Sequence, residues 1–173
     1  MKKSKRSDVD PFIVMDVMEA ARVAEEKGKD IIHMEVGQPG TPAPKTARDF
    51  ITNEINKNNL GYTVSLGLPD LRKKISNLYG DWYNLDVNPN RIVVTTGSSG
   101  AFILSFSALF DSGDRVGIGY PSYPSYRQIL KSLSLETVDI QTKLQNRFQP
   151  VPEDIINNNL NGILVASPAN PTG

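Results

Sequence analysis

The chain has 173 residues, with 19 basic and 19 acidic side chains, one histidine and no cysteine. This length suits a single domain with a sizeable core, and the balanced charge gives no overall field that would attract nucleic acid or an anionic membrane. The absence of cysteine excludes disulfide scaffolds, thiolate metal sites and thiol nucleophiles. No apolar run approaches membrane-spanning length, and acidic residues interrupt the region where a secretory signal would need one. We therefore expect a cytoplasmic protein with no membrane or nucleic-acid partner.

The start of the chain predicts an arm, a helix and a strand. The basic opening MKKSKR is expected to be a frayed, solvated arm. Asp10 and Pro11 predict a helix start, and apolar residues then recur at helical spacing until a Lys-Gly stop at residue 28. The segment 31–37, IIHMEVG, alternates like a half-buried strand. This pattern would place His33 on the less buried face of the strand, in a structural role.

The middle of the chain predicts two helices, around 45–57 and 69–83, joined by the irregular segment NLGYTVSLGLPD. From residue 91 onward, compact apolar runs alternate with helical patterns. Apolar strands separated by helices favour an α/β fold with a mainly parallel sheet covered on both faces. The predicted strands are 91–96, 114–120, 135–140 and 161–167, and the predicted helices are 97–110 and 125–133.

Three of these strands end in polar turns of small residues: TTGSSG, YPSYPSY and SPANPTG. Ligands of parallel sheets bind at the carboxyl ends of the strands, so the three turns indicate one site. In the first turn, Ser98 and Ser99 open an apolar helix whose first N–H groups have no intrahelical partner and are suited to an anion. The alternative is a tight turn with serine caps. The turn matches neither a P-loop nor a dinucleotide fingerprint.

The other two turns each carry a side chain with two possible roles. Tyr123 is placed to cover a planar ring, or it packs as tyrosines commonly do. Asn170, between Ala169 and Pro171, either hydrogen-bonds a ring substituent or shapes its turn.

These ordered motifs resemble the class I/II aminotransferases, which are fold-type I enzymes that depend on pyridoxal 5′-phosphate. The resemblance covers nearly all of the chain after the arm. It implies a three-layer α/β/α architecture, with an arm, helix and first strand in 1–36 and part of the cofactor-binding large domain in 37–173. The motifs are MEVGQPGTPAP, GYTVSLGLPDLRKKI, VVTTGSSGAFIL, YPSYPSYR and SPANPTG.

The resemblance also implies a role for each matching residue. Ser98 and Ser99 would hold the cofactor phosphate through backbone N–H groups and a hydroxyl. Tyr123 would stack on the pyridine ring, and Asn170 would hydrogen-bond the phenolic oxygen of that ring. A phosphate, a flat ring and a phenolate do need these three kinds of group.

Two further roles concern a partner subunit and the substrate. Tyr62, in the GYT segment, would reach the phosphate of the cofactor in a partner subunit, so the resemblance implies a homodimer. Gly37 would leave room for the substrate carboxylate. The substrates implied are an amino acid and a 2-oxo acid.

The family continues well past the asparagine motif. Its later part supplies an aspartate at the pyridine nitrogen, the Schiff-base lysine and an arginine for the substrate carboxylate. Lys73, Lys74 and Lys131 lie in helical, solvated patterns, and we expect no catalytic residue in this chain. The resemblance thus predicts a truncated large domain that is inactive alone.

Two alternative functions remain open at this point. One is another fold-type I reaction, such as β-elimination by a C–S lyase. The other is a noncatalytic remnant that binds phosphorylated ligands or takes part in assembly.

Overall fold

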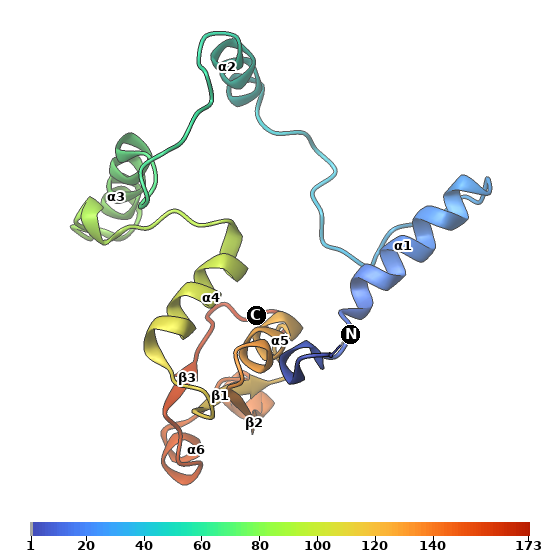
Figure 1. Cartoon of the computed structure of the whole chain (residues 1–173), viewed down its shortest axis with the longest axis vertical. Coiled ribbons are helices and arrows are strands. Elements are labelled where there is room, and N and C mark those ends of the chain that lie inside the picture. Colours follow the sequence, from blue (N-terminus) through green and yellow to red (C-terminus); the bar gives the residue numbers. More distant parts are fainter. Residues whose placement is uncertain (1) are drawn as a thin grey trace. The chain divides into compact units, whose positions relative to one another are not determined.

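The computed structural model describes residues 2–173, and Figure 1 labels its main helices and strands. By their internal contacts these residues separate into two units. The first unit combines the N-terminal segment up to Asp16 with Thr96–Gly173. The second unit comprises Val17–Thr95. The two ends of the chain therefore belong to one unit and its middle makes the other. The predicted division into 1–36 and 37–173 stays a prediction.

A three-stranded parallel sheet forms the centre of the first unit. β1 (Arg115–Tyr120) pairs with β2 (Glu136–Gln141) on one side and with β3 (Gly162–Leu164) on the other, which gives the order β2-β1-β3. Parallel neighbours need long crossover connections, and helices supply them here. This alternation agrees with the predicted α/β fold. The helices of the unit are η1 (Lys5–Ser7), α4 (Gly97–Leu109), α5 (Pro124–Ser132), η3 (Leu144–Asn146) and α6 (Pro152–Asn157).

The core of the first unit lies between the sheet and helices α4 and α5. Side chains alternate along a strand, so Val116 and Ile118 of β1 share one face, and each is 1% exposed. Phe106 of α4 and Ile129 and Leu130 of α5 belong to the same buried cluster. Full burial of an aliphatic or aromatic side chain is worth about 1.5–3 kcal/mol. A small set of side chains therefore holds two helices on the sheet.

Glycines on β1 let other residues approach the opposite face closely. A Cβ atom at Gly117 would lie 2.6 Å from Cδ1 of Leu160 and 3.0 Å from Cδ1 of Ile140. At Gly119, the next glycine on this face, an added Cβ atom would lie 3.8 Å from Cγ and Cδ of Pro150. Glycine in a strand often marks such a close approach. Both faces of β1 are thus covered, as the sequence predicts.

The second unit is helical. Its helix α3 begins with a proline, which suits the first turn, and ends at Asn84 in the left-handed conformation. The segment that follows α3 then packs back against the helix. Two hydrogen bonds hold it there: Arg72 Nη1 donates to the Pro89 carbonyl at 3.1 Å, and Ser76 Oγ donates to the Val87 carbonyl at 2.6 Å. The elements are α1 (Ile13–Glu26), whose first residues belong to the first unit, α2 (Lys45–Ile55), α3 (Pro69–Tyr83) and η2 (Pro89–Arg91).

Two predicted strands, 31–37 and 91–96, are wrong. Neither segment pairs with another strand in residues 2–173. Ile92 does have an extended backbone, with φ −103° and ψ 126°. Val94 N–H, however, donates to the Leu66 carbonyl at 3.0 Å and not to a neighbouring strand. A strand pattern needs a partner to become a sheet, and the described residues give these two segments none.

Two element boundaries and the conformation of the arm also differ from expectation. The first helix begins at Ile13 and not at Asp10, and its N-terminal neighbourhood contacts α5. The third strand is shorter than the predicted 161–167. The basic arm is exposed, as expected, but it forms the short helix η1, which contacts α5 and is not frayed.

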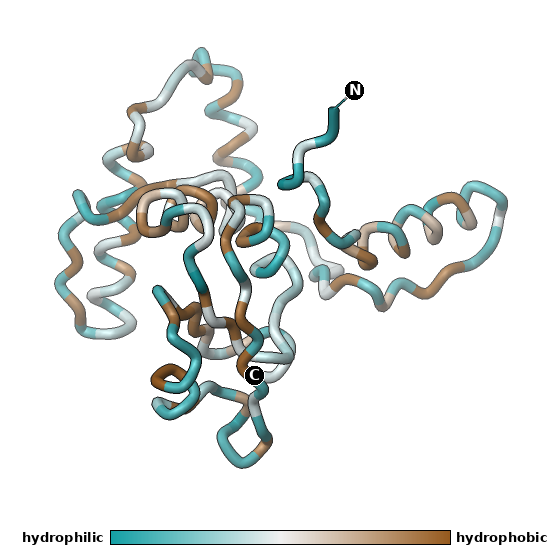
Figure 2. The backbone as a smooth tube through the Cα atoms, turned by 60° about the horizontal axis from the view of Figure 1, so that its bottom comes forward, coloured by the Kyte–Doolittle hydropathy of each residue, from teal (hydrophilic) through white to brown (hydrophobic). Residues whose placement is uncertain are grey.

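Large apolar side chains remain exposed in the second unit. Within Val17–Thr95 the one buried side chain is that of Arg72, and apolar residues such as Phe50, Leu60 and Trp82 are 66%, 70% and 68% exposed. Figure 2 shows hydrophobic and hydrophilic residues alternating along the helices. Within residues 2–173, no helix is both long and apolar enough to span a bilayer.

Candidate functional site

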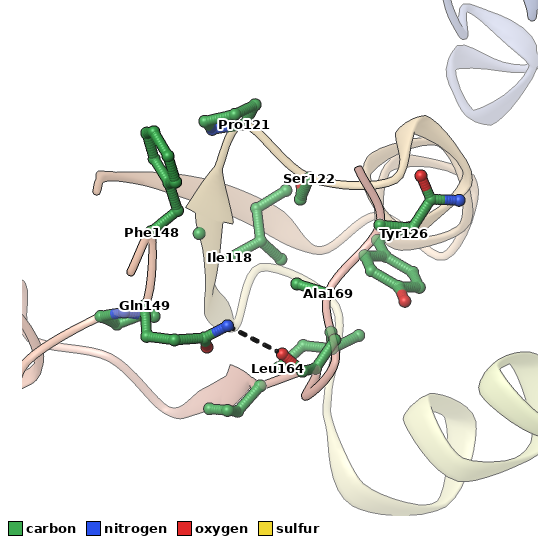
Figure 3. Close-up of a pocket in the computed structure, with 13 residues that line it drawn as sticks. Ile118, Pro121, Ser122, Tyr126, Phe148, Gln149, Leu164 and Ala169 are labelled. Carbon is green, nitrogen blue, oxygen red and sulfur yellow. Dashed lines mark hydrogen bonds between the residues drawn. The ribbon is translucent and has the colours of Figure 1, made fainter. Parts of the chain in front are cut away.

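A pocket lies at the carboxyl ends of β1 and β3 (Figure 3). The two strands are parallel neighbours, so the turns that follow them meet at one edge of the sheet. Pro121 and Ser122 follow β1, and Ala169 and Asn170 follow β3. The pocket has a volume of about 20 Å³, which is room for about one water molecule. The pocket is therefore too small to hold a ring-sized ligand.

Asn170 stands exposed on the rim of the pocket, in the SPANPTG turn. Two hydrogen bonds to backbone carbonyls shape its surroundings. Gly173 N–H donates to the Ala169 carbonyl at 2.6 Å, which closes the turn. Gln149 Nε2 donates to the Ala166 carbonyl at 3.1 Å and ties the opposite wall of the pocket to the exit of β3. The amide of Asn170 is thus available on a turn that is anchored at both sides.

Tyr123 precedes the first turn of α5, as the residue at its N-cap, and is half-buried. Its ring contacts Tyr126 edge to face, with centroids 5.5 Å apart. Tyr126 in turn lines the pocket. Tyr123 is therefore joined to the pocket through its neighbour, and its ring is not part of the pocket wall.

Ser98 and Ser99 lie in the first turn of α4 and are exposed. Thr96, the N-cap residue, makes no side-chain cap hydrogen bond. The first N–H groups of a helix have no intrahelical partner and carry the positive end of its dipole. Phe102, on the next turn of α4, contacts Tyr126 with centroids 5.2 Å apart. This contact ties the beginning of α4 to the beginning of α5, at the end of the unit where Tyr123 lies.

Gly37 and Tyr62 belong to the second unit and are exposed. A Cβ atom on Gly37 would meet no atom within 4 Å, and the side chain of Tyr62 is fully exposed. The contacts described above therefore link the segments that carry Asn170, Tyr123 and the two serines, but not those that carry Gly37 and Tyr62.

Sequence reasoning missed two residues of the pocket, Tyr126 and Gln149. Tyr126 belongs to the YPSYPSYR motif, so its place among clustered tyrosines was a signal for it. Gln149 lies in an irregular segment without a motif, and its contact spans 17 residues of sequence. No local pattern would have identified it.

The ion pair between Arg127 of α5 and Asp139 of β2 holds the helix beside the pocket. Arg127 Nη1 and Nη2 donate to the two carboxylate oxygens at 3.0 and 2.5 Å. The hydrogen bonds to Asp139 raise the pKa of Arg127 above its usual range. The guanidinium therefore stays charged and fixes α5 on the sheet.

His33 forms a separate cluster in the second unit. Its Nδ1 lies 2.7 Å from Glu35 Oε1, and its Nε2 lies 2.9 Å from Glu25 Oε1. The hydrogen bond to Glu35, followed by that to Glu25, raises the pKa of His33 to about 9. The ring is exposed and not on a strand, but the expected structural role fits, because it joins α1 to the following segment. No group of side chains within residues 2–173 is suited to hold a metal ion.

Comparisons with known proteins show which family this chain is similar to. The sequence model of the family "Aminotransferase class I and II" matches residues 29–173. A relative from Mycobacterium tuberculosis, named valine–pyruvate aminotransferase, is 45% identical over 97% of this chain and 44% of its own length. An aspartate aminotransferase from Thermotoga maritima is 32% identical over 92% of this chain and 43% of its own length. This chain thus spans less than half the length of the curated relatives it matches.

Solved structures agree with the sequence relatives. An aminotransferase from Mycobacterium tuberculosis superposes with a TM-score of 0.92 at 42% identity, over 99% of this chain and 45% of that one. The protein in a crystal structure from Silicibacter pomeroyi is 58% identical in sequence. It superposes with a TM-score of 0.86 over 99% of this chain and 44% of that one. Both the family match and these identities cover far more than half of the chain. The chain belongs to the class I and II aminotransferase family.

Proposed function

We propose that this chain is the N-terminal part of an aminotransferase that moves an amino group from an amino acid to a 2-oxo acid with pyridoxal 5′-phosphate as its cofactor. Its family membership supports the reaction class. The observation that carries the proposal is the beginning of α4, where Ser98 and Ser99 are exposed and Thr96 makes no side-chain cap. The proposal includes the cytoplasm as the place of action.

The residues present fit this cofactor. The N–H groups and hydroxyls of Ser98 and Ser99 are donors for the phosphate dianion. The ring of Tyr123 offers a face for the pyridine ring, and the amide of Asn170 offers a donor for the phenolic oxygen. When bound, pyridoxal phosphate supplies an electron-withdrawing ring that stabilises negative charge at the carbon bearing the amino group. The residues of this chain hold and orient that ring.

Two residues extend the proposal to the substrate and to a partner subunit. We assign the fully exposed Tyr62 to the phosphate of the cofactor in a second subunit, which makes the working enzyme a homodimer. Gly37, with open space where a Cβ would stand, leaves room for the substrate carboxylate.

We propose no catalytic residue within these 173 residues. Lys73, Lys74 and Lys131 are exposed on α3 and α5, and we assign the covalent lysine to a part of the enzyme beyond them. The name of the 45% identical relative makes valine and pyruvate the first substrates to test in the complete enzyme.

The test is binding of pyridoxal 5′-phosphate to this chain, followed by its absorption spectrum and by titration. We expect noncovalent binding with a Kd between millimolar and micromolar, because a few charge-assisted hydrogen bonds must offset the cost of ordering the ligand. After borohydride, the intact mass should be unchanged. A reduced adduct on one lysine of this chain would contradict the assignment of the covalent lysine.

A matched pair of variants locates the phosphate. Ser99→Asp places a negative charge in the first turn of α4 and should raise the Kd at least about tenfold, because a charge-assisted hydrogen bond is worth about 1.5–3 kcal/mol. Ser105→Asp puts the same charge on an exposed position of the same helix and should leave the Kd within about twofold. Equal effects of the two variants would show that the phosphate does not bind at the beginning of α4.

A further inference from the structure

The segment before α1 contacts α5 at two points. The Asp10 carbonyl accepts a hydrogen bond from Gln128 Nε2 at 2.9 Å. The ring of Phe12 meets the ring of Tyr123 edge to face, with centroids 5.9 Å apart and planes at 86°. The hydrogen bond joins residues 118 positions apart in the sequence. The segment is therefore held on α5 by tertiary contacts, and the contact at Phe12 falls on the tyrosine proposed to face the cofactor ring.

Tyr123 is held between a ring from the core side and a ring from the N-terminal segment. On the core side it contacts Tyr126, which contacts Phe102 of α4. Phe102 stacks on Phe106 at 5.5 Å, and Phe106 is buried. This series of rings fixes one side of Tyr123 relative to the core. Its other contact, with Phe12, is made by a single half-buried ring.

We propose that Phe12 is a positioning residue that holds the Tyr123 ring in the orientation needed to stack on a bound pyridine ring. The inference rests on the proposed function, because it assumes that Tyr123 faces the cofactor. Without Phe12, the Tyr123 side chain gains rotational freedom that binding must remove again. Immobilising such a side chain on binding corresponds to about a two- to tenfold change in Kd.

Phe12 should affect binding of the pyridine ring of the cofactor but not binding of its phosphate. Phe12 contacts Tyr123, whereas the phosphate is assigned to Ser98 and Ser99 on α4. Loss of the Phe12 ring should therefore weaken binding of a ligand that has a pyridine ring and leave binding of phosphate alone unchanged. A purely structural role for Phe12 would weaken both.

The experiment measures two Kd values, for pyridoxal 5′-phosphate and for inorganic phosphate, on the full chain. Phe12→Leu keeps an apolar side chain and removes the ring, and we expect a Kd for pyridoxal 5′-phosphate about two- to tenfold higher with the phosphate Kd unchanged. Gln128→Ala, which releases the segment at its other contact, should act in the same direction. Ile13→Ala is the control, because Ile13 is the next residue and is 67% exposed; it should change neither Kd.

A double-mutant cycle with Tyr123→Leu tests whether Phe12 acts on cofactor binding through Tyr123. In that background Phe12→Leu should have no further effect, and an additional loss would overturn the proposal. An unchanged Kd for pyridoxal 5′-phosphate in Phe12→Leu alone would overturn the inference and leave the proposed function standing. Equal weakening of both ligands would make Phe12 merely structural and also overturn it. A wild-type chain that binds neither ligand would overturn the proposed function and the inference together.

Discussion

The two units of this chain differ in what holds their helices. In the first, seven buried apolar side chains, all within residues 106–140, pack α4 and α5 on a parallel sheet. In the second, from Val17 to Thr95, no apolar side chain is buried, and α3 is held by hydrogen bonds from Arg72 and Ser76 to the returning chain. A sheet gives the first unit a surface on which apolar helix faces are removed from water. The second unit has amphipathic helices without such a surface, so most of its stability must be local.

Removal of a core side chain from the first unit should have the largest effect on stability. Leu130 is 0% exposed, and Leu130→Ala should lower the free energy of unfolding by about 2–5 kcal/mol, through lost transfer energy and the cavity left behind. The matched control is Leu78→Ala on α3, where the side chain is 39% exposed. It should change the free energy by less than about 0.5 kcal/mol. Urea unfolding followed by circular dichroism measures both, and equal losses would show that the second unit has a core of its own.

Glycine substitutions should have smaller effects on stability, of opposite sign in the two units. Gly117→Ala should destabilise the first unit by about 1–3 kcal/mol, because the new Cβ would press on Leu160 and Ile140. Gly80→Ala on α3 has open space, with the Leu85 carbonyl 3.8 Å from the new Cβ, and should stabilise its helix by about 0.5–1 kcal/mol. Opposite shifts in the melting temperature are the expected result. A neutral Gly117→Ala would mean that Leu160 does not cover the sheet.

The smallest effect concerns the histidine cluster of the second unit. With its pKa raised to about 9, His33 contributes stability that is fully present below about pH 6.5 and is lost as the pH rises through about 9. An NMR titration needs no assignment, because the chain has one histidine. Glu35→Gln should move the midpoint down toward 6.5 further than Glu25→Gln does. A wild-type midpoint near 6.5 would show that the cluster does not form in solution.

Sequence reasoning located α1 to α5 because their signals are local, but it missed the short helix α6. Pro69, the spacing of apolar residues and the stop at Asn84 define α3 without reference to the rest of the chain. Strands are different, because a strand forms only with a partner. The runs around β1, β2 and β3 have partners in the described residues and were found, whereas 31–37 and 91–96 carry equally good patterns and pair with no strand there.

In the candidate site, too, the features with local sequence motifs were predicted and the contacts between distant segments were not. Motifs identified the strand-end turns, and Asn170 does lie on the rim of a pocket at the exit of β3. The contacts that give the pocket its walls, such as Gln149 with Ala166, join irregular segments and have no sequence signature. The contact between Phe12 and Tyr123 is of the same kind, since it joins residues at opposite ends of the chain.

β1 pairs with both other strands, but its two partners lie at different distances along the sequence. Arg115 and Glu136, at the start of the β1–β2 ladder, are 21 residues apart, whereas Arg115 and Asn161, beside β3, are 46 apart. Closing the longer loop costs about 0.7 kcal/mol more in chain entropy. Local pairings form faster, so β2 should join β1 before β3 does. Asn170 follows β3, so we expect the rim of the candidate site to assemble last, on a sheet that has already begun to form.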